Sequence, residues 1–131
     1  MLTIDRIDHI VLTVENIDRA CAFYEKLGMT RVSFGNDRVG VSFGSAHQQR
    51  INFHEVGRVI QPRAARATVG SADFCLVTSY DMQTLLAHLS SQNISIELGP
   101  VGRNGSLGPM QSVYVRDPDN NLVEISTYAP G

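Results

Sequence analysis

The same order of predicted elements occurs twice along this 131-residue chain. Residues 7–14 form a mostly apolar run that predicts a buried strand, and Asn16 can cap a helix whose apolar side chains recur at helical spacing. Three short runs typical of strands follow at about 30–35, 38–43 and 50–55. The first half therefore predicts the order βαβββ.

The second half predicts the same order of strands and helix. Residues 72–78 predict a strand, and Asp81 can cap a second helix. Three further strands are expected at 94–98, 111–116 and 122–127. Moving the first half along by 64 residues aligns strand with strand and helix with helix without a gap, although few residues are identical. The chain therefore predicts an α+β fold of two tandem βαβββ modules within one domain.

The module boundaries follow from the same pattern. The first module is expected at about 4–57 and the second at about 71–128, with a connector at about 58–70. The connector lacks the Ser/Gly-rich or charged composition of a flexible linker. A second loop is expected at 99–109, which holds four of the eleven glycines. It either closes over a ligand or joins two strands.

The closing run of the chain places one carboxylate in a predicted strand. Residues 117–121, Asp-Pro-Asp-Asn-Asn, predict a tight turn, because Pro fixes φ and Asp and Asn side chains bond their own backbone. The strand after it is expected to be largely buried. A buried carboxylate without a partner would lose its charge. Glu124 is therefore expected to pair with either a metal ion or an arginine.

Composition and charge exclude several classes of partner. A net charge of −2 argues against nucleic acid and against an anionic membrane surface. The chain has no apolar run near the ~20 residues of a membrane span and no secretory signal pattern. Cys21 and Cys75 fall in a predicted helix and a predicted strand, so two buried thiols are expected in place of a disulfide. These features predict a cytoplasmic protein.

Segments at both ends of the chain resemble those of a known superfamily. Residues 8–14, Asp-His-Ile-Val-Leu-Thr-Val, and 22–29, Ala-Phe-Tyr-Glu-Lys-Leu-Gly-Met, resemble the opening of the vicinal oxygen chelate superfamily. That superfamily includes glyoxalase I, fosfomycin-resistance transferases, extradiol dioxygenases and bleomycin-binding proteins. Residues 114–125 are similar to its closing strand pair. Residues 52–57 and 70–76 most resemble a little-characterised branch of glyoxalase-domain proteins.

The resemblance implies a metal site. It implies paired modules whose curved sheets form an open barrel around the metal, with ligands on the first strand of each module and on the last strand of the second. Carried over, these ligands are His9, Asp73 and Glu124. Asp73 departs from the family, which commonly has His there, and is either a ligand, a group that holds His9 in one tautomer, or a residue facing water. One imidazole with two carboxylates suits Mn²⁺, Fe²⁺, Ni²⁺ or Mg²⁺, and Zn²⁺ is also possible.

His54 is a second candidate, either as a ligand or as a substrate contact. Phe53 and His54 face opposite sides of their strand, so only one of them points into the site. An internal alignment that places Ile51 or Phe53 opposite Glu124 predicts that His54 turns away from it.

Other polar residues are candidates for catalysis and substrate binding. Glu55, or Glu124 released from the metal, is expected to move the proton. Arg63 and Arg103 either clamp an anionic substrate with paired hydrogen bonds or are simply solvated. Tyr114 either lines the site or packs against the second helix.

The sequence thus predicts a metal-dependent enzyme of the glyoxalase-like class, a lyase or isomerase whose small oxygenated or carbonyl substrate is chelated by a divalent metal ion. One alternative is a non-catalytic drug-binding protein of the bleomycin-resistance type. Another is a relative of the extradiol dioxygenases, whose chemistry favours two histidines and one carboxylate. The resemblance also implies a homodimer with sites shared between chains. Fold alone does not name the substrate.

Overall fold

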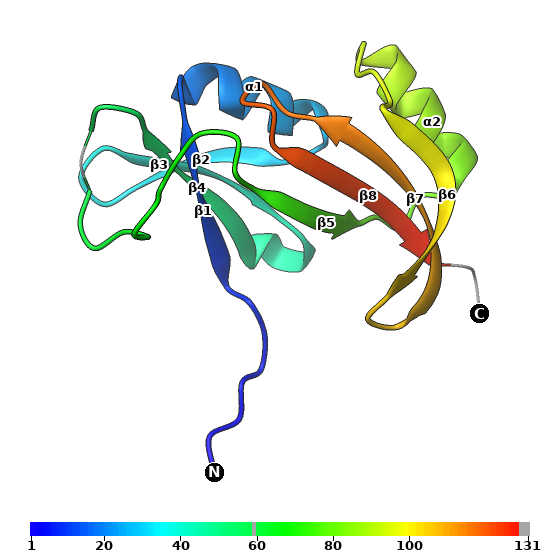
Figure 1. Cartoon of the computed structure of the whole chain (residues 1–131), viewed down its shortest axis with the longest axis horizontal. Coiled ribbons are helices and arrows are strands. Elements are labelled where there is room, and N and C mark those ends of the chain that lie inside the picture. The colour runs from blue at the N-terminus through cyan, green and yellow to red at the C-terminus, as the bar shows by residue number, and fades with distance from the viewer. Residues whose placement is uncertain (59, 129–131) are drawn as a thin grey trace. The chain divides into compact units, whose positions relative to one another are not determined.

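The chain has an α+β fold with two βαβββ modules, each built on a four-stranded mixed sheet (Figure 1). The structure is a computed structural model that describes residues 1–58 and 60–128. It consists of two compact units, Met1–Val69 and Gly70–Gly131. The predicted fold class is confirmed.

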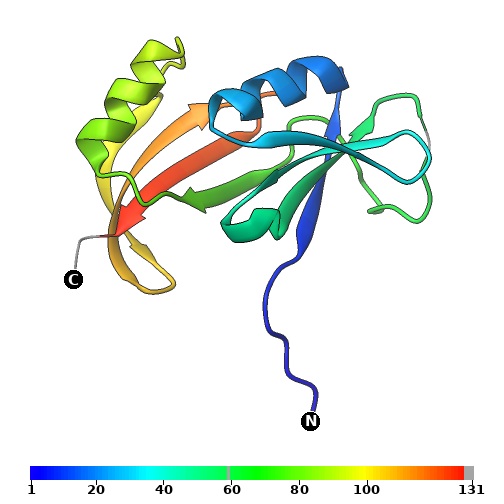
Figure 2. The same ribbon diagram turned by 180° about the vertical axis from the view of Figure 1, so that it is seen from behind.

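The first unit contains one sheet, one helix and a short 3-10 turn. Its elements are β1 (His9–Val14), α1 (Ile17–Lys26), β2 (Thr30–Phe34), β3 (Arg38–Phe43), the turn η1 (Ser45–His47) and β4 (Gln49–Glu55). The strand order is β1-β4-β3-β2, with β1 parallel to β4 and the other pairs antiparallel. The eight residues before β1 extend away from the sheet (Figure 2), so this strand begins two residues later than predicted.

Helix α1 covers one face of the first sheet. The Asn16 side chain accepts a hydrogen bond from the backbone N–H of Arg19 at 2.8 Å, which confirms the predicted cap. The buried Tyr24 ring lies 5.9 Å from the ring of Phe53 on β4. Ile51 and Phe53 therefore face the helix. The even-numbered residues of β4 lie on the opposite side, which we call the helix-free face of the first unit.

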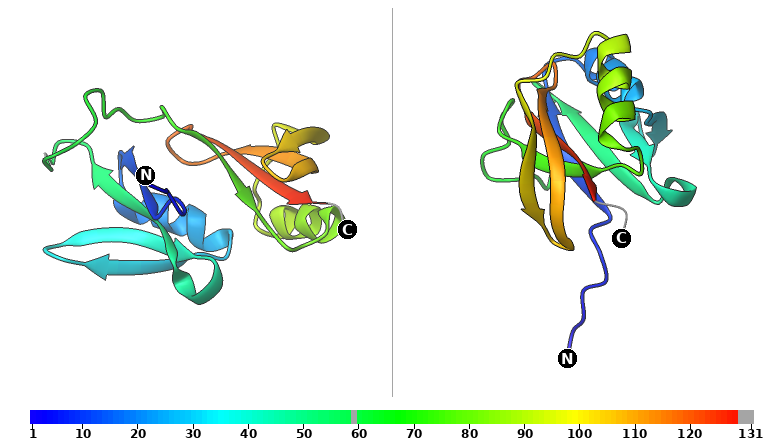
Figure 3. Two further views of the ribbon diagram at one scale, coloured as in Figure 1. Left: turned by 90° about the horizontal axis from the view of Figure 1, so that it is seen from below. Right: turned by 90° about the vertical axis from the view of Figure 1, so that its right-hand side faces the viewer.

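The second unit repeats this arrangement. Its elements are β5 (Asp73–Val77), α2 (Met82–Ser91), β6 (Leu98–Gly105), β7 (Gly108–Arg116) and β8 (Leu122–Tyr128). The strand order is β5-β8-β7-β6, with β5 parallel to β8. Helix α2 is capped by Asp81, as predicted, and lies against one face of this sheet (Figure 3). Its buried Leu85 and Leu89 lie on the core side of the unit. The other side is the helix-free face of the second unit.

Two details of the predicted second half are wrong. The strand expected at 94–98 begins only at Leu98 and continues through the expected loop, so β6 and β7 form a hairpin with its turn near Ser106 and Leu107. The register shifts between Leu98 and Val101, and such an irregularity accommodates Pro100 within a strand. The helices are also 65 residues apart and not 64, as the caps Asn16 and Asp81 show.

The closing turn is held by side-chain hydrogen bonds, as its sequence predicts. The Asp117 carboxylate accepts hydrogen bonds from the backbone N–H groups of Asp119 and Asn121, both at 2.9 Å, and from the Asn121 amide at 2.8 Å. The Asn121 side-chain oxygen accepts from the N–H of Ala72 at 2.9 Å. The turn therefore fixes the start of β8 beside the start of β5.

The cysteines are both free, which confirms that they form no disulfide. Cys21 is buried in α1, but Cys75 is exposed on β5, so the prediction of two buried thiols is wrong. Cys75 points to the helix-free face, where no helix covers it. Among the described residues, no helix is long and apolar enough to cross a membrane.

Candidate functional site

His9 stands at the start of β1 with its imidazole held by the preceding residue. Its Nδ1 lies 2.8 Å from a carboxylate oxygen of Asp8. The hydrogen bond to His9 is the main cause that lowers the pKa of Asp8, so this carboxylate is ionised and accepts the bond. Nδ1 therefore carries a proton, and in the neutral ring Nε2 is the nitrogen with the lone pair. A carboxylate that fixes the imidazole in this way is typical of metal-binding histidines.

Asn52 on β4 is the counterpart of Glu124 on β8. Strand register pairs His9 with Arg50 and Val11 with Asn52 in the first unit. In the second unit it pairs Asp73 with Leu122 and Cys75 with Glu124. In each unit, then, a candidate ligand at the start of the first strand has a polar residue diagonally across from it on the last strand. The predicted alignment of Ile51 or Phe53 with Glu124 is wrong.

The Asn52 side chain is buried, with an oxygen that lacks a hydrogen bond. The residue is only 2% exposed, and its Oδ1 has no partner among the described residues. Gly40 on β3 lies directly opposite, and a Cβ there would approach this oxygen to 3.0 Å and the Ile51 carbonyl oxygen to 2.5 Å. Glycine therefore leaves the room that the amide occupies. A buried acceptor without a donor carries a desolvation cost, which a cation would offset.

His54 lies on the same helix-free face as His9, so the expectation that it turns away is wrong. The prediction placed Ile51 or Phe53 on the side of the site. Phe53 instead packs on Tyr24 of α1, so His54, the next residue, faces the opposite side. A terminal nitrogen of Arg38 lies 3.1 Å from His54 Nε2. A guanidinium only donates, so Nε2 accepts and the proton is on Nδ1. Burial, with a smaller contribution from Arg38, lowers the pKa of His54, which keeps the ring neutral. Its Nε2 is therefore occupied.

Glu124 is half-buried on β8 and has a hydroxyl partner. The Ser126 hydroxyl donates a hydrogen bond to the Glu124 carboxylate at 3.2 Å. Among the described residues, no arginine forms an ion pair with Glu124. Ser126 also lies 2.6 Å from the hydroxyl of Ser112 and 3.2 Å from the thiol of Cys75. The polar groups of this helix-free face thus contact one another.

Tyr114 and Arg103 lie beside Glu124 on the same face. Tyr114 is directly opposite Glu124 in the pairing of β7 with β8. The Arg103 Nε donates to the Tyr114 hydroxyl at 3.0 Å, and its guanidinium carbon lies 5.5 Å from the ring centroid. The structure therefore brings together two of the predicted substrate-binding residues with Glu124. It also shows that Tyr114 points away from the face that α2 covers.

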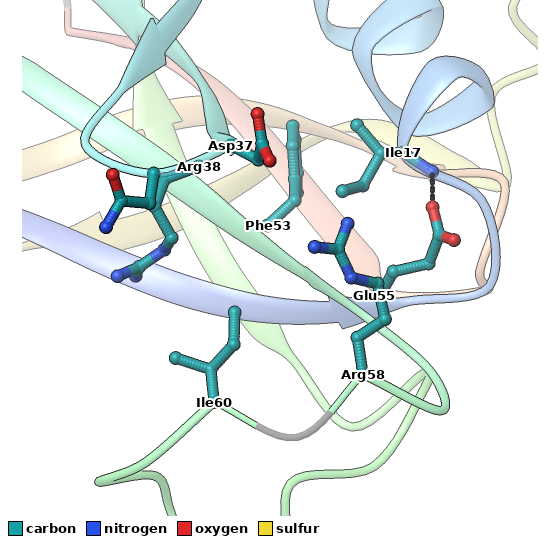
Figure 4. Close-up of a pocket in the computed structure, with 8 residues that line it drawn as sticks. Ile17, Asp37, Arg38, Phe53, Glu55, Arg58 and Ile60 are labelled. Carbon is teal, nitrogen blue, oxygen red and sulfur yellow. Dashed lines mark hydrogen bonds between the residues drawn. The ribbon is translucent and has the colours of Figure 1, made fainter.

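The other predicted residues are placed less favourably. Asp73 is exposed at the start of β5, and Arg63 is exposed in the segment that follows β4. Glu55 accepts a hydrogen bond from the backbone N–H of Ile17 at 3.1 Å, so its carboxylate stabilises the first turn of α1 (Figure 4). Since Glu55 and Phe53 share one side of β4, Glu55 lies on the side opposite His54.

A pocket of about 240 Å³ opens beside Glu55. Its lining comprises Ile17, Asn36, Asp37, Arg38, Phe53, Glu55, Arg58 and Ile60, and Figure 4 shows the Arg58 side chain extending from its loop toward Phe53. This volume is below the ~300–1,000 Å³ that is usual for small-molecule sites. It also lies away from His9, so it is not the predicted metal site.

Within the described residues, no group of three or more His, Cys, Asp and Glu side chains could hold a metal ion. Each unit supplies a pair, His9 with Asn52 or Asp73 with Glu124. Asn52 was missed in the sequence because an asparagine in an apolar run gives no ligand signal. Only the strand register, repeated in the second unit, identifies it.

The fold and these positions place the chain in a known family. A model of the Glyoxalase/Bleomycin resistance protein/Dioxygenase superfamily matches residues 6–125. The chain belongs to this superfamily, whose members bind small molecules and often metals.

Individual relatives agree with this assignment. The chain is 44% identical over 128 residues to virulence protein STM3117 of Salmonella typhimurium, covering 97% of this chain and 87% of that protein. It is 42% identical over 127 residues to glyoxalase domain-containing protein RDO1 of Mycosarcoma maydis, covering 97% and 70%. The structure of VPC_CASS1 from the mobile metagenome of V. Pseudocholerae superimposes with a TM-score of 0.94 at 43% identity, covering 99% of both chains.

Proposed function

We propose that the protein is a metal-dependent lyase or isomerase of the glyoxalase-like type, acting on a small substrate with neighbouring oxygen atoms. The observation that carries the proposal is the repeated diagonal pair. Each unit has one candidate ligand at the start of its first strand and one on its last strand, on the helix-free face.

The donor atoms suit a divalent metal. His9 offers Nε2 because Asp8 holds Nδ1, and the buried amide oxygen of Asn52 has no hydrogen bond within the described part of the chain. Asp73 and Glu124 add carboxylates. One imidazole with oxygen ligands favours Mn²⁺, Fe²⁺, Ni²⁺ or Mg²⁺, with Zn²⁺ also compatible. Since each unit supplies only a pair, we propose that a second chain in a homodimer supplies further ligands.

The metal, when bound, would act as a Lewis acid toward a substrate oxygen. The proposed proton carrier is Glu124 when it is released from the metal, since Glu55 is engaged at the N-terminus of α1. The Ser126 hydroxyl orients the Glu124 carboxylate at 3.2 Å. Tyr114 and Arg103, which are joined by a hydrogen bond beside Glu124, are proposed to contact the substrate.

Metal binding tests the proposal directly. Protein freed of metal with a chelator is titrated with Mn²⁺, Ni²⁺ and Zn²⁺ while its thermal midpoint and bound metal are measured. The expected result is about one metal per site and a concentration-dependent rise in midpoint, because a ligand that binds only the folded state stabilises it. His9→Ala and Glu124→Ala should abolish the rise, whereas His88→Ala on α2 should keep it.

A different outcome favours the alternative. If less than about one-tenth of an equivalent of metal binds, and His9→Ala leaves the midpoint with added metal unchanged, the metal-dependent reading is wrong. A non-catalytic binding protein on the same fold would then be the better description. Light scattering tests the proposed homodimer, and a single 14.4 kDa species would contradict it.

A further inference from the structure

Two arginines of the first unit lie against one aromatic ring on its helix-free face. The guanidinium carbon of Arg50 on β4 is 4.1 Å from the ring centroid of Phe34 on β2, and that of Arg38 on β3 is 5.3 Å away. Each contact is a cation–π interaction that holds the guanidinium in place. Two like charges are thus brought to one ring.

Neither guanidinium has an acidic partner. Among the residues that the structure describes, Arg38 and Arg50 form no ion pair, and the Nε of each is buried without a hydrogen bond. Asp8 is close enough for Arg50 to contribute to lowering the pKa of its carboxyl, but its oxygens contact His9 and Arg6. Half-buried arginines are usually paired, so this arrangement is costly without an anion.

Neighbouring residues fix the two side chains. Arg38 donates to the neutral His54, which holds one of its terminal nitrogens without compensating its charge. Gly40 lies on β3, the strand that carries Arg38, and its lack of a side chain lets the Asn52 amide lie close against this strand. The face therefore presents two guanidinium groups whose positions are fixed by Phe34 and His54.

We propose that Arg38 and Arg50 bind a carboxylate of the substrate, which makes the substrate a small organic acid. Guanidinium groups match carboxylate geometry with two parallel hydrogen bonds, and such charge-assisted bonds are strong. This inference rests on the proposed function for calling the ligand a substrate. Asn52 lies on the same face as the arginines, so the acid would be anchored beside a proposed metal ligand.

Binding is tested on the full chain treated with a chelator, so that metal does not contribute. The probes are acetate, succinate and benzoate, each compared with its neutral amide, together with inorganic phosphate. Calorimetry gives affinities, and NMR follows the Nε–H signals of Arg38 and Arg50. At least one acid should bind about tenfold or more tightly than its amide and shift both signals, because a hydrogen bond to a charged group contributes that much or more.

Variants separate this role from a structural one. Arg38→Gln and Arg50→Gln should each weaken acid binding by about tenfold without changing amide binding. Arg50→Lys keeps the charge but loses the two parallel hydrogen bonds, so its affinity for the acid should lie between those of the unchanged protein and Arg50→Gln. Arg31→Gln is the matched control, since Arg31 is on β2, pairs with Asp18 on α1 and faces the other side of the sheet. It should bind as the unchanged protein does.

Several results would overturn the inference. They are equal affinity for acids and amides, acid binding that survives both glutamine substitutions in folded protein, or phosphate bound more tightly than every carboxylate with the same arginine dependence. A repeat with Mn²⁺ separates the two proposals. Arginine-dependent acid binding without any metal binding refutes only the proposed function, and metal binding without acid selectivity refutes only this inference.

Discussion

The helix-free faces of the two units have the same strand register but opposite chemistry. Where the first unit has Asn52 on its last strand, the second has Glu124. Opposite these residues lie Gly40 in the first unit and Tyr114 in the second. Among the described residues, the first face carries two guanidinium groups without acidic partners, whereas the second carries carboxylates, hydroxyls and one guanidinium, Arg103, which is bonded to Tyr114.

The two faces also differ in how many of their buried polar groups form hydrogen bonds. In the second unit Ser126 contacts a serine, a thiol and a carboxylate. In the first unit one amide oxygen and two guanidinium nitrogens are buried without hydrogen bonds among the described residues. The polar groups of the second face thus form hydrogen bonds with one another, whereas several polar groups of the first face are left without one. This unused hydrogen-bonding capacity is the reason for proposing that the first face binds the carboxylate of a small molecule.

The largest expected effect comes from adding a side chain at Gly40 in the first unit. In Gly40→Ala the new Cβ would lie 2.5 Å from the Ile51 carbonyl oxygen, a backbone atom that cannot move away without disturbing the sheet. The free energy of unfolding should fall by about 2–3 kcal/mol, as measured by urea denaturation. Gly102→Ala on β6, where a Cβ meets nothing within 4 Å, should change it by less than about 0.5 kcal/mol. Equal effects of the two substitutions would contradict the account of Gly40.

A smaller loss is expected from breaking the satisfied network of the second face. Ser126→Ala leaves the buried Ser112 hydroxyl without its 2.6 Å partner and should cost about 1–2 kcal/mol of unfolding free energy. The double variant Ser112→Ala/Ser126→Ala should cost less than the sum of the single variants, because no hydroxyl is then left unpaired. Additive losses would show that the two hydroxyls act independently. Ser106→Ala in the exposed hairpin turn is the control.

The smallest expected effect is a pH dependence confined to the first face. The pKa of His54 is below its usual 6.5 in the folded protein, so the unfolded chain binds the proton more readily. Its contribution to stability is complete above about pH 6.5 and is lost as pH falls through the lowered pKa. The urea midpoint should therefore decline as the pH falls below about 6.5, and less so in His54→Gln.

The carboxylates do not obscure this window. Asp8, Asp81 and Glu97 also have lowered pKa values, but their contribution is present above their unfolded values of 3.8 to 4.5 and is lost only in more acid solution. His88→Gln on α2 serves as the control. Identical slopes for His54→Gln and the unchanged protein would mean that His54 is not the responsible group.

The fold was predictable because the signals that define it are local. Helix caps at Asn16 and Asp81 and the Asp-Pro-Asp-Asn-Asn turn act over a few residues, so they can be identified without knowing the tertiary structure. The β6–β7 hairpin was not predicted, since glycines and Pro100 are typical of loops and only the register irregularity makes them compatible with a strand.

The site was predictable only in part. His9 and Glu124 were identified by resemblance, and their roles as ligands stay predictions. Asn52, Arg38 and Arg50 were not singled out, because their significance depends on what lies across the sheet from them. That Arg38 and Arg50 meet at Phe34 follows from pairing among three strands, which residue spacing along the chain does not reveal.

The absent side chain at Gly40 also bears on how this protein can evolve. Every amino-acid replacement of a glycine adds a Cβ, and a single base change in a glycine codon is enough to produce one. The close approach of β3 to Asn52 is therefore easily lost by mutation and restored only by returning to glycine. Because the added Cβ would meet a backbone oxygen, relatives that keep this strand pairing should keep glycine at this point whether or not they bind the same ligand.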